Sequence, residues 1–286
     1  MKRPAYANDK ALKQFIKSAL EEDLGKGDHS TLSTIPKDLV QSARLLVKED
    51  CILAGVELAE IIFKTFDKNM QVEIFIKDGD SAKKGDVAFI VTGKAQSILQ
   101  TERLVLNCMQ RMSGIATMTH DWDSRLVGTK TKLLDTRKTT PNFRICEKWA
   151  VAIGGGTNHR YGLYDMIMLK DNHIDYNGNI TNAVKAAKEY LKKHKLRLKI
   201  EVETRNLEEV QEAIDAKADR IMLDNMDVPM MKKAVKLIGG KAETEASGGI
   251  TRNMLKDIAK TGVDYISAGA LTHSVQNIDL SLKAVK

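Results

Sequence analysis

Apolar and polar residues follow two different patterns along this chain, and the change falls near residue 130. Before it, an amphipathic helix is predicted over 9–22, and short alternating strands are predicted within 42–93. After it, short apolar runs alternate regularly with amphipathic helical segments. A period of two residues is typical of half-buried strands, and a spacing of three to four residues is typical of helices. The chain is therefore predicted to hold a small α/β layer followed by repeated β–α units.

The first part contains one strongly apolar helix, VELAEIIFKTF, between strands whose turns carry Gly and Asp. Asp9 is placed to cap the first helix. One long helical segment is predicted over 96–126, either continuous or broken near Ser113 and Gly114, and Arg103 and Arg111 lie off its apolar stripe. The loop EDLGKGDHST matches no calcium-loop spacing, so a turn near a subunit contact is favoured over a cation site.

Six candidate strands follow residue 130: KLLDT, MIMLK, LKIEVE, RIMLD, TEAS and VDYISAG. Successive β–α units of this length build a parallel sheet, which commonly closes into a barrel and binds ligands at the carboxyl ends of its strands. These ends carry Asp135 with Arg137, Lys170 with Asp171, Glu201 and Glu203, Asp224 with Asn225, Ser247 with Gly248 and Gly249, and Gly269. Polar residues at every strand end predict a functional face there.

The composition of the chain argues against several classes of ligand and partner. The 286 residues carry a net charge of +7, which raises nucleic acid as a ligand, but Lys is scattered and only 5% of residues are aromatic, so stacking platforms are scarce. No run approaches about eighteen apolar residues, and the N-terminus lacks a signal-peptide core, so a cytoplasmic protein without a membrane partner is expected. The three cysteines are scattered without CxxC spacing, which argues against a disulfide framework and a structural zinc site.

The densest chemistry lies in residues 133–173. This stretch gathers Asp135, Arg137, Lys138, Arg144, His159, Arg160, Lys170, Asp171 and His173. Buried like charges need paired carboxylates or a ligand of opposite charge. The clustered cations therefore predict a pocket for a small acidic molecule, although any single Lys is more often a solvated surface residue.

Carboxylates and glycine turns complete the predicted site. Glu203 and Asp224 are expected on adjacent strand ends, and the turns SGGIT and SAGA each precede a predicted helix, so their amides can face a phosphate. For SGGIT an ordinary tight turn is an equally good interpretation. Mg²⁺ prefers one or two carboxylates plus phosphate oxygens, which predicts a magnesium-bound phosphorylated substrate. Cys146 has no evident base partner, so transfer without a covalent enzyme intermediate is favoured.

The motifs resemble those of the quinolinate phosphoribosyltransferase family through nearly the whole chain. DTRKTTP, GGGxxHRxGLxD and KDNH in this order are highly specific together. Further matching segments are ALEEDLGKGDHST, TERLVLN, MSGIAT, EKWAV, EVE, LDN, ASGGIT and GVDYISAGALTHS. One departure is Asn142, at a position that is often Gly in the family, and Asn tolerates similar turns.

This resemblance implies an N-terminal open-faced α/β sandwich over 1–112 and a C-terminal incomplete (β/α) barrel over 113–272. A final helix over 273–286 would pack back on the N-terminal domain. The implied activity is phosphoribosyl transfer from phosphoribosyl pyrophosphate to quinolinate with decarboxylation, which gives nicotinate mononucleotide, pyrophosphate and CO₂ in de novo NAD biosynthesis. A homodimer with shared active sites is also implied, and a higher oligomer is left open.

Carried over by motif, the resemblance assigns the quinolinate carboxylates to Arg137, His159 and Arg160, with Arg103 reaching in from the other subunit. Thr136 belongs to the same substrate-binding set. Lys138 and Lys170 would face both carboxylate and pyrophosphate, and with Arg137 they form the expected catalytic group. Their positive charge would stabilise the departing pyrophosphate.

The resemblance also implies that Glu203 and Asp224 bind the ribose hydroxyls and Mg²⁺, the metal partly through substrate and water, with Glu201 a weaker candidate. The 5′-phosphate cradle would comprise Ser247, Gly248, Gly249, Ala268, Gly269 and Ala270. No general base is expected, because no proton is removed before decarboxylation. Two alternatives stay open: a related phosphoribosyltransferase acting on another acidic heterocycle, and a nucleic-acid-binding protein.

Overall fold

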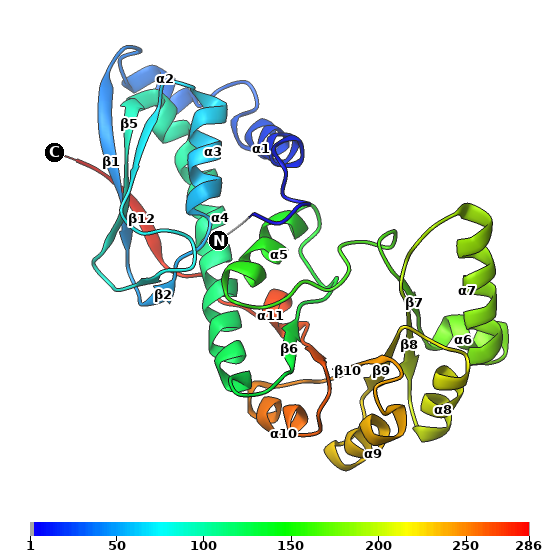
Figure 1. Ribbon diagram of the computed structural model, residues 1–286. Coiled ribbons are helices and arrows are strands. Elements are labelled where there is room, and N and C mark those ends of the chain that lie inside the picture. The colour runs from blue at the N-terminus through cyan, green and yellow to red at the C-terminus, as the bar shows by residue number, and fades with distance from the viewer. Residues whose placement is uncertain (1–2, 286) are drawn as a thin grey trace. The chain divides into compact units, whose positions relative to one another are not determined.

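The computed structural model describes residues 3–285, which fold into two compact units (Figure 1). The first unit combines the chain up to residue 120 with 139–155 and the C-terminal segment from 271, and the second combines 121–138 with 156–270. The mixed α/β fold expected from the sequence is confirmed. The domain boundaries at 112 and 272 stay predictions.

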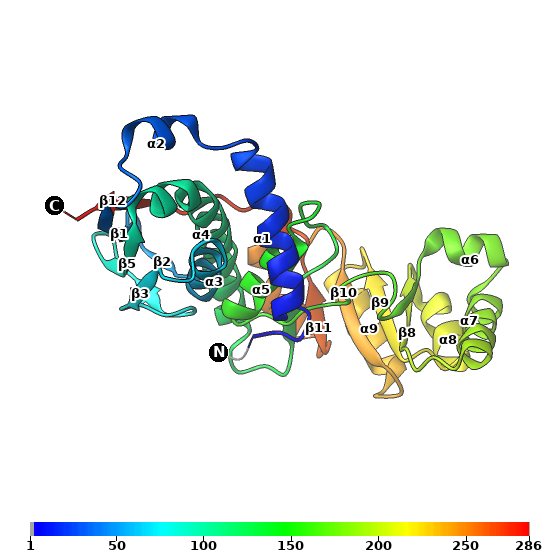
Figure 2. The ribbon, with the colours of Figure 1, turned by 90° about the horizontal axis from the view of Figure 1, so that it is seen from above.

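The first unit centres on a four-stranded antiparallel sheet in the order β12-β1-β5-β3. The strands are β1 Val40–Val47, β3 Gln71–Ile74, β5 Val87–Lys94 and β12 Leu280–Ala284, and a separate pair joins β2 Cys51–Ile52 to β4 Ser81–Ala82. Helices α3 Val56–Phe66 and α4 Ala95–Asp123 lie along one face of the larger sheet (Figures 1 and 2). Phe63 of α3 and Phe89 of β5 are fully buried there and meet edge to face, with ring centroids 6.0 Å apart.

The remaining helices of this unit include one departure from the sequence predictions, at the start of α1. They are α1 Asp9–Leu24, α2 His29–Thr34, α5 Arg144–Ile153 and the short α11 Ala270–His273. Asn8, rather than Asp9, caps α1, because its side chain accepts the amide of Ala11 at 3.1 Å. Helix α4 runs without a break through Ser113, whose hydroxyl instead accepts the amide of Ala54.

The end of the chain is a strand, so the helix predicted over 273–286 is wrong. Helix α11 ends at His273, and β12 then pairs antiparallel with β1 from Leu280 opposite Val47 to Ala284 opposite Ala43. Leu280 and Leu282 are buried and alternate with more exposed residues, which is the period of a strand lying on a core. The segment does return to the N-terminal sheet, as predicted.

The second unit is a six-stranded parallel sheet in the order β6-β11-β10-β9-β8-β7. Its strands are β6 Lys132–Leu134, β7 Ile167–Leu169, β8 Ile200–Thr204, β9 Arg220–Asp224, β10 Glu243–Ser247 and β11 Tyr265–Ser267. All six predicted strands are therefore confirmed. Since β6 and β7 are the two edges, the sheet is a (β/α) barrel left open between its first and second strands.

One or two helices follow each strand from β7 to β10, and each helix buries an apolar face. They are α6 Asp171–Asn177, α7 Ile180–His194, α8 Leu207–Asp215, α9 Val228–Ile238 and α10 Leu255–Ala259. Asn179, Asn206 and Asp227 cap α7, α8 and α9 with side-chain hydrogen bonds, whereas the side chain of Thr251, which precedes α10, makes no such bond. Among the described residues, no helix is both long and apolar enough to cross a bilayer.

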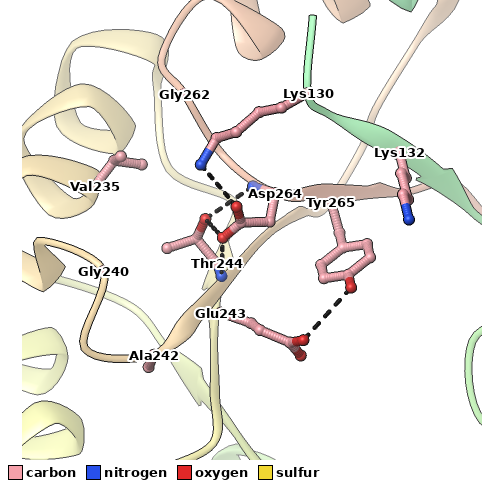
Figure 3. A pocket seen from close by; sticks show the side chains of 10 residues that line it. All are labelled: Lys130, Lys132, Val235, Gly240, Ala242, Glu243, Thr244, Gly262, Asp264 and Tyr265. Carbon is pink, nitrogen blue, oxygen red and sulfur yellow. Dashed lines mark hydrogen bonds and ion pairs between the residues drawn. The ribbon is translucent and has the colours of Figure 1, made fainter.

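A surface pocket of about 400 Å³ lies at the amino ends of β10 and β11, away from the strand ends that carry the predicted site (Figure 3). Asp264 connects residues on different sides of this pocket. Its carboxylate accepts hydrogen bonds from the backbone amide and the hydroxyl of Thr244, at 2.9 and 2.8 Å, and forms an ion pair with Lys130 at 2.7 Å. Burial alone would raise the pKa of Asp264, but these partners outweigh it and hold the pKa below its usual value.

Replacing Asp264 by Asn is expected to destabilise the fold in a pH-dependent way. A carboxyl group whose folded-state pKa is depressed adds stability above its unfolded pKa, and this is lost as the pH falls through the folded pKa. The difference in unfolding free energy between the wild type and Asp264→Asn should therefore be full at pH 7 and shrink below about pH 4. Urea titrations across this range measure it. Asp257→Asn, which removes an exposed carboxylate, is the control and should change little.

Candidate active site

The carboxyl ends of β7, β8 and β9 bring one cation and two carboxylates together. In β8, Val202 is fully buried against the helices, so Glu201 and Glu203 share the opposite, inward face of the strand. Lys170, directly after β7, reaches Glu203 with Nζ to Oε2 2.7 Å. Burial, then the charge of Glu203, raises the pKa of Asp224, and the charge of Lys170 opposes this shift. Glu203 and Asp224 therefore lie close to each other and to Lys170.

Two guanidinium groups form a second region of positive charge. Burial and the charge of Arg137 lower the pKa of Arg160, so the two side chains repel each other across a short distance. Arg160 is half-buried and donates from Nη1 to the carbonyl of Met166 at 3.3 Å. Paired cations of this kind are stabilised by an anion that both can contact.

Beneath these groups lies a buried cluster inside the sheet. His159 Nε2 lies 3.0 Å from Glu201 Oε2 and 3.2 Å from Glu245 Oε2, and both carboxylates are fully buried. Arg220 closes the cluster from β9, with Nη1 3.0 Å from Glu245 Oε2, and its guanidinium stacks over the ring of Tyr265 at 4.1 Å. Two acidic and two basic side chains therefore occupy one interior layer of the sheet.

Both nitrogens of the His159 imidazole have close polar neighbours. Nδ1 accepts the backbone N–H of Arg160 at 2.6 Å, which requires a lone pair on that nitrogen. Burial lowers the pKa of His159, but Glu201 and Glu245 outweigh it and raise the pKa to about 9, which by itself favours a doubly protonated ring. The contact at Nδ1 excludes the doubly protonated ring, because a proton on Nδ1 would point at the N–H of Arg160. We therefore assign the neutral ring with its proton on Nε2.

The segment that carries His159 is fastened to the free edge of β6. Thr157 forms a parallel bridge with Leu134. The carboxylate of Asp135, which is fully buried, accepts the amide of His159 at 2.8 Å and the side-chain amide of Asn158 at 2.7 Å. The predicted contact between His159 and a substrate carboxylate stays a prediction.

The turn after β10 fits tightly against the turn after β9. Gly248 has φ +95°, and a Cβ atom there would lie 2.2 Å from Oδ1 of Asn225. Asn225 itself has φ +53°, donates its amide to the carbonyl of Ser247 at 2.9 Å, and bonds Oδ2 of Asp224 through its side chain at 2.7 Å. The SGG turn is therefore locked to the residue that follows Asp224.

Replacing Gly248 by Ala is expected to lower the free energy of unfolding by about 1–3 kcal/mol, because the new Cβ meets Asn225 and the backbone is left-handed. Chemical denaturation of the wild type and of Gly248→Ala measures this difference in the free energy of unfolding. Gly249→Ala is the matched control, since Gly249 has φ +58° and nothing lies within 4 Å of the position of a Cβ. Equal losses in the two variants would mean that the contact with Asn225 does not matter.

The second predicted phosphate turn is less open than the sequence indicated. The amide of Ala268 donates to the carbonyl of Leu134 at 3.0 Å, so it continues the sheet and is not available to a phosphate. Helix α11, which follows this turn, has only four residues, and α10, which follows the SGG turn, has five. A strong helix dipole is therefore missing behind either turn.

The other predicted residues are distributed between the units. Thr136 and Lys138 lie in the turn after β6, where the Thr136 hydroxyl accepts the amide of Lys138 at 3.0 Å. Arg103 is exposed on α4, in the first unit. Arg144 starts α5 and donates to the hydroxyl of Thr139, and Asn142 has φ +60°, which explains why this position suits Gly or Asn.

Sequence reasoning missed two members of the buried cluster, Arg220 and Glu245, and treated Glu201 as a weak candidate. A signal was present, because Arg220 opens a strand that is otherwise buried and apolar, and Glu245 stands in the middle of another. A charged residue inside a buried strand needs a partner of opposite charge. Which strands face each other, however, follows only from the fold.

The carboxylates at the strand ends suit a magnesium ion. Glu203 and Asp224 offer the hard oxygen ligands that Mg²⁺ prefers, and two carboxylates fit an ion that takes its other ligands from a phosphorylated substrate and water. Burial and the charge of Glu203 raise the pKa of Asp224, which a divalent cation between them would reverse. Lys170 at present supplies the positive charge at Glu203.

An open parallel barrel with cations and carboxylates gathered at its strand ends defines an α/β-barrel enzyme for anionic substrates. The family model "Quinolinate phosphoribosyl transferase, C-terminal domain" matches residues 115–283, and the model for the N-terminal domain of the same family matches residues 28–113. The chain therefore belongs to the quinolinate phosphoribosyltransferase family.

Individual relatives agree with this assignment. The chain is 50% identical to a rice protein named nicotinate-nucleotide pyrophosphorylase [carboxylating], chloroplastic, over 95% of this chain and 77% of the relative. It is 43% identical to a probable nicotinate-nucleotide pyrophosphorylase [carboxylating] of Bacillus subtilis, over 96% and 94%. The crystal structure of NadC from Streptococcus pyogenes matches with a TM-score of 0.90 and 37% identity, covering 98% of this chain and 99% of that one. The sandwich and incomplete barrel predicted from the sequence are confirmed by these matches.

Proposed function

We propose that the protein transfers a phosphoribosyl group from phosphoribosyl pyrophosphate to quinolinate and releases CO₂, forming nicotinate mononucleotide for de novo NAD biosynthesis. The observation that carries this proposal is the division of charge at the strand ends. Arg137 and Arg160 lie together, while Lys170 adjoins the carboxylates of Glu203 and Asp224. The names of the relatives support the same activity.

The guanidinium groups form the side of the site that suits a planar diacid. Each can donate two parallel hydrogen bonds to a carboxylate, and their mutual repulsion falls when an anion binds. A substrate with two carboxylates satisfies more of this positive charge than a monocarboxylate does. In the proposed assembly Arg103 adds a further cation from the partner of a homodimer; its exposure on α4 suits that role.

The carboxylate side suits the ribose and the metal-bound pyrophosphate. Glu203 and Asp224 would accept hydrogen bonds from the ribose hydroxyls and hold Mg²⁺, which neutralises charge on pyrophosphate when bound. The Ser247 to Gly249 turn would face the 5′-phosphate, together with Gly269 and Ala270. For Ala268, a phosphate contact through its amide conflicts with the bond to Leu134.

The chemistry needs positive charge more than a base. The pyridine nitrogen uses its lone pair to form a bond to C1 of the ribose as the C1–oxygen bond breaks and pyrophosphate leaves. Lys138 and Lys170 would stabilise the negative charge that grows on that leaving group. The carboxylate at C2 then leaves as CO₂, its bonding electrons are stabilised by the adjacent pyridinium, and C2 takes up a proton. No step removes a proton from the substrate, so no general base is required.

Assembly and location follow the family only as proposals. A homodimer is proposed because the expected site draws Arg103 from a second copy. Plant relatives are named chloroplastic or mitochondrial and the Bacillus relative is not, so the cytoplasmic location expected from the sequence stays a prediction.

The test is to incubate the purified protein with quinolinate, phosphoribosyl pyrophosphate and Mg²⁺, and to measure nicotinate mononucleotide and CO₂. Equal amounts of the two products are expected, with little turnover when nicotinate replaces quinolinate. Faster consumption of nicotinate or of another acidic heterocycle would favour the related-transferase alternative. A salt-dependent gel shift with nucleic acid at physiological ionic strength, without either product, would favour the nucleic-acid alternative.

A further inference from the structure

The buried carboxylates of Glu201 and Glu245 have no direct part in the proposed reaction. Both are fully buried, and one oxygen of each lies close to the same nitrogen of His159, at 3.0 and 3.2 Å. Two carboxylates this deep in a protein carry a large desolvation cost, so the fold must gain something from holding them there. The nearest feature of the site is the backbone of Arg160, one residue beyond His159.

His159 connects the carboxylates to Arg160 through its two ring nitrogens. A carboxylate that accepts the Nε2 proton fixes the tautomer in which Nδ1 carries a lone pair. Nδ1 then accepts the amide of Arg160 at 2.6 Å. Asp135 holds the amide of His159 itself at 2.8 Å, so the peptide on each side of His159 is fixed.

Arg220 makes this arrangement electrostatically sustainable. Its Nη1 lies 3.0 Å from Glu245, and its Nη2 lies 3.0 Å from Glu243 near the surface. A divalent metal held by His159, Glu201 and Glu245 is a second interpretation, since one ligand atom from each lies within 4.8 Å of the others. Arg220 argues against it, because the guanidinium already supplies positive charge to Glu245 and would repel a cation.

We propose that Glu201 and Glu245 are positioning residues that fix His159 as the Nε2-protonated tautomer, so that Nδ1 holds the Arg160 backbone and aims its guanidinium at the diacid. The role of Arg160 as the target rests on the proposed function. His159 is on this account a positioning residue as well.

Substitutions at Glu201 separate this role from packing. Glu201→Gln keeps an oxygen that accepts the Nε2 proton, whereas Glu201→Met keeps the volume without an acceptor. We expect Glu201→Gln to stay within about threefold of the wild-type KM for quinolinate and Glu201→Met to raise it by about 10- to 100-fold, the loss of a charge-assisted hydrogen bond. The KM for phosphoribosyl pyrophosphate should change less than about threefold in both. A packing role alone predicts that Met, which is apolar, serves at least as well as Gln.

Glu243→Gln is the matched control, since Glu243 contacts Arg220 from the same strand as Glu245 but does not reach His159. It should leave the KM for quinolinate unchanged. If Glu201→Met does not fold, Glu245→Met replaces it in the comparison, with circular dichroism and thermal melting confirming that the variant is folded. A KM for quinolinate equal to that of the wild type in the folded Met variant would overturn the proposal.

A second readout does not depend on activity. Nitrogen NMR of the ligand-free protein labelled at its six histidines, with His159 assigned through His159→Asn, reports which ring nitrogen carries the proton. An unprotonated Nδ1 that persists near neutral pH supports the proposal, and a protonated Nδ1 contradicts it. Stoichiometric metal in the purified wild type that is lost in Glu201→Gln would also contradict it. Because this readout needs no substrate, it stands or falls separately from the proposed function.

Discussion

Lys170→Ala is expected to lower kcat by about 10²- to 10³-fold, the size of effect seen when one group that stabilises transition-state charge is removed. Lys170 lies 2.7 Å from Glu203 of β8, and its charge also acts on Asp224 of β9. In the proposed reaction negative charge grows on the departing pyrophosphate, and the ammonium group offsets it. Lys138→Ala should act in the same direction, since Lys138 follows the first strand of the same barrel.

Lys199→Ala is the control for this prediction. Lys199 pairs with Glu243 at 2.8 Å and has a side chain 53% exposed, against 2.7 Å and 47% for Lys170 with Glu203. The two ion pairs are alike in geometry, but Lys199 precedes β8 rather than following a strand of the barrel. Its loss should leave kcat within about twofold, as for an exposed pair. Undiminished turnover in Lys170→Ala and Lys138→Ala would show that neither lysine stabilises the leaving group.

Arg137→Ala and Arg160→Ala are each expected to raise the KM for quinolinate by about 10- to 100-fold, because each loses charge-assisted hydrogen bonds to a carboxylate. The KM for phosphoribosyl pyrophosphate should stay nearly constant, since the two guanidinium groups adjoin each other and not the carboxylate pair. Arg160→Lys should recover little, because an ammonium cannot make the two parallel bonds of a guanidinium. Initial rates with each substrate varied in turn measure both constants.

Arg205→Ala serves as the matched control. Its guanidinium is 49% exposed and pairs with Glu209 four residues along the same surface. Removing it should leave both KM values unchanged. If Arg160→Ala altered the KM for phosphoribosyl pyrophosphate instead of that for quinolinate, the two sides of the site would have been assigned the wrong way round.

The sequence predicts the fold well wherever a segment carries its own periodicity. All six barrel strands were predicted from short apolar runs, because strands covered by helices must be apolar on the covered face. The final segment was harder: LSLKA holds only three apolar residues, and its strand forms because it pairs with the edge of β1. Because β1 lies more than 200 residues away in the chain, the sequence of the final segment itself does not show that it pairs there.

The residues of the site also fall into those that the sequence predicts and those that it does not. Lys170, Glu203 and Asp224 were predicted because each ends a strand, and parallel strands bring their carboxyl ends together. The two carboxylate partners of His159 were not predicted, since Glu201 and Glu245 come from β8 and β10, which are not neighbours in the sheet. Contacts across the interior of a barrel depend on its curvature, which no stretch of sequence encodes alone.

The most direct test of the central claim is a crystal structure of the protein with quinolinate, Mg²⁺ and an unreactive analogue of phosphoribosyl pyrophosphate. Both carboxylates of quinolinate are expected against Arg137 and Arg160, with the metal and ribose at Glu203 and Asp224 and Lys170 beside the pyrophosphate. Quinolinate bound away from both guanidinium groups, or the sugar phosphate bound away from both carboxylates, would contradict the account.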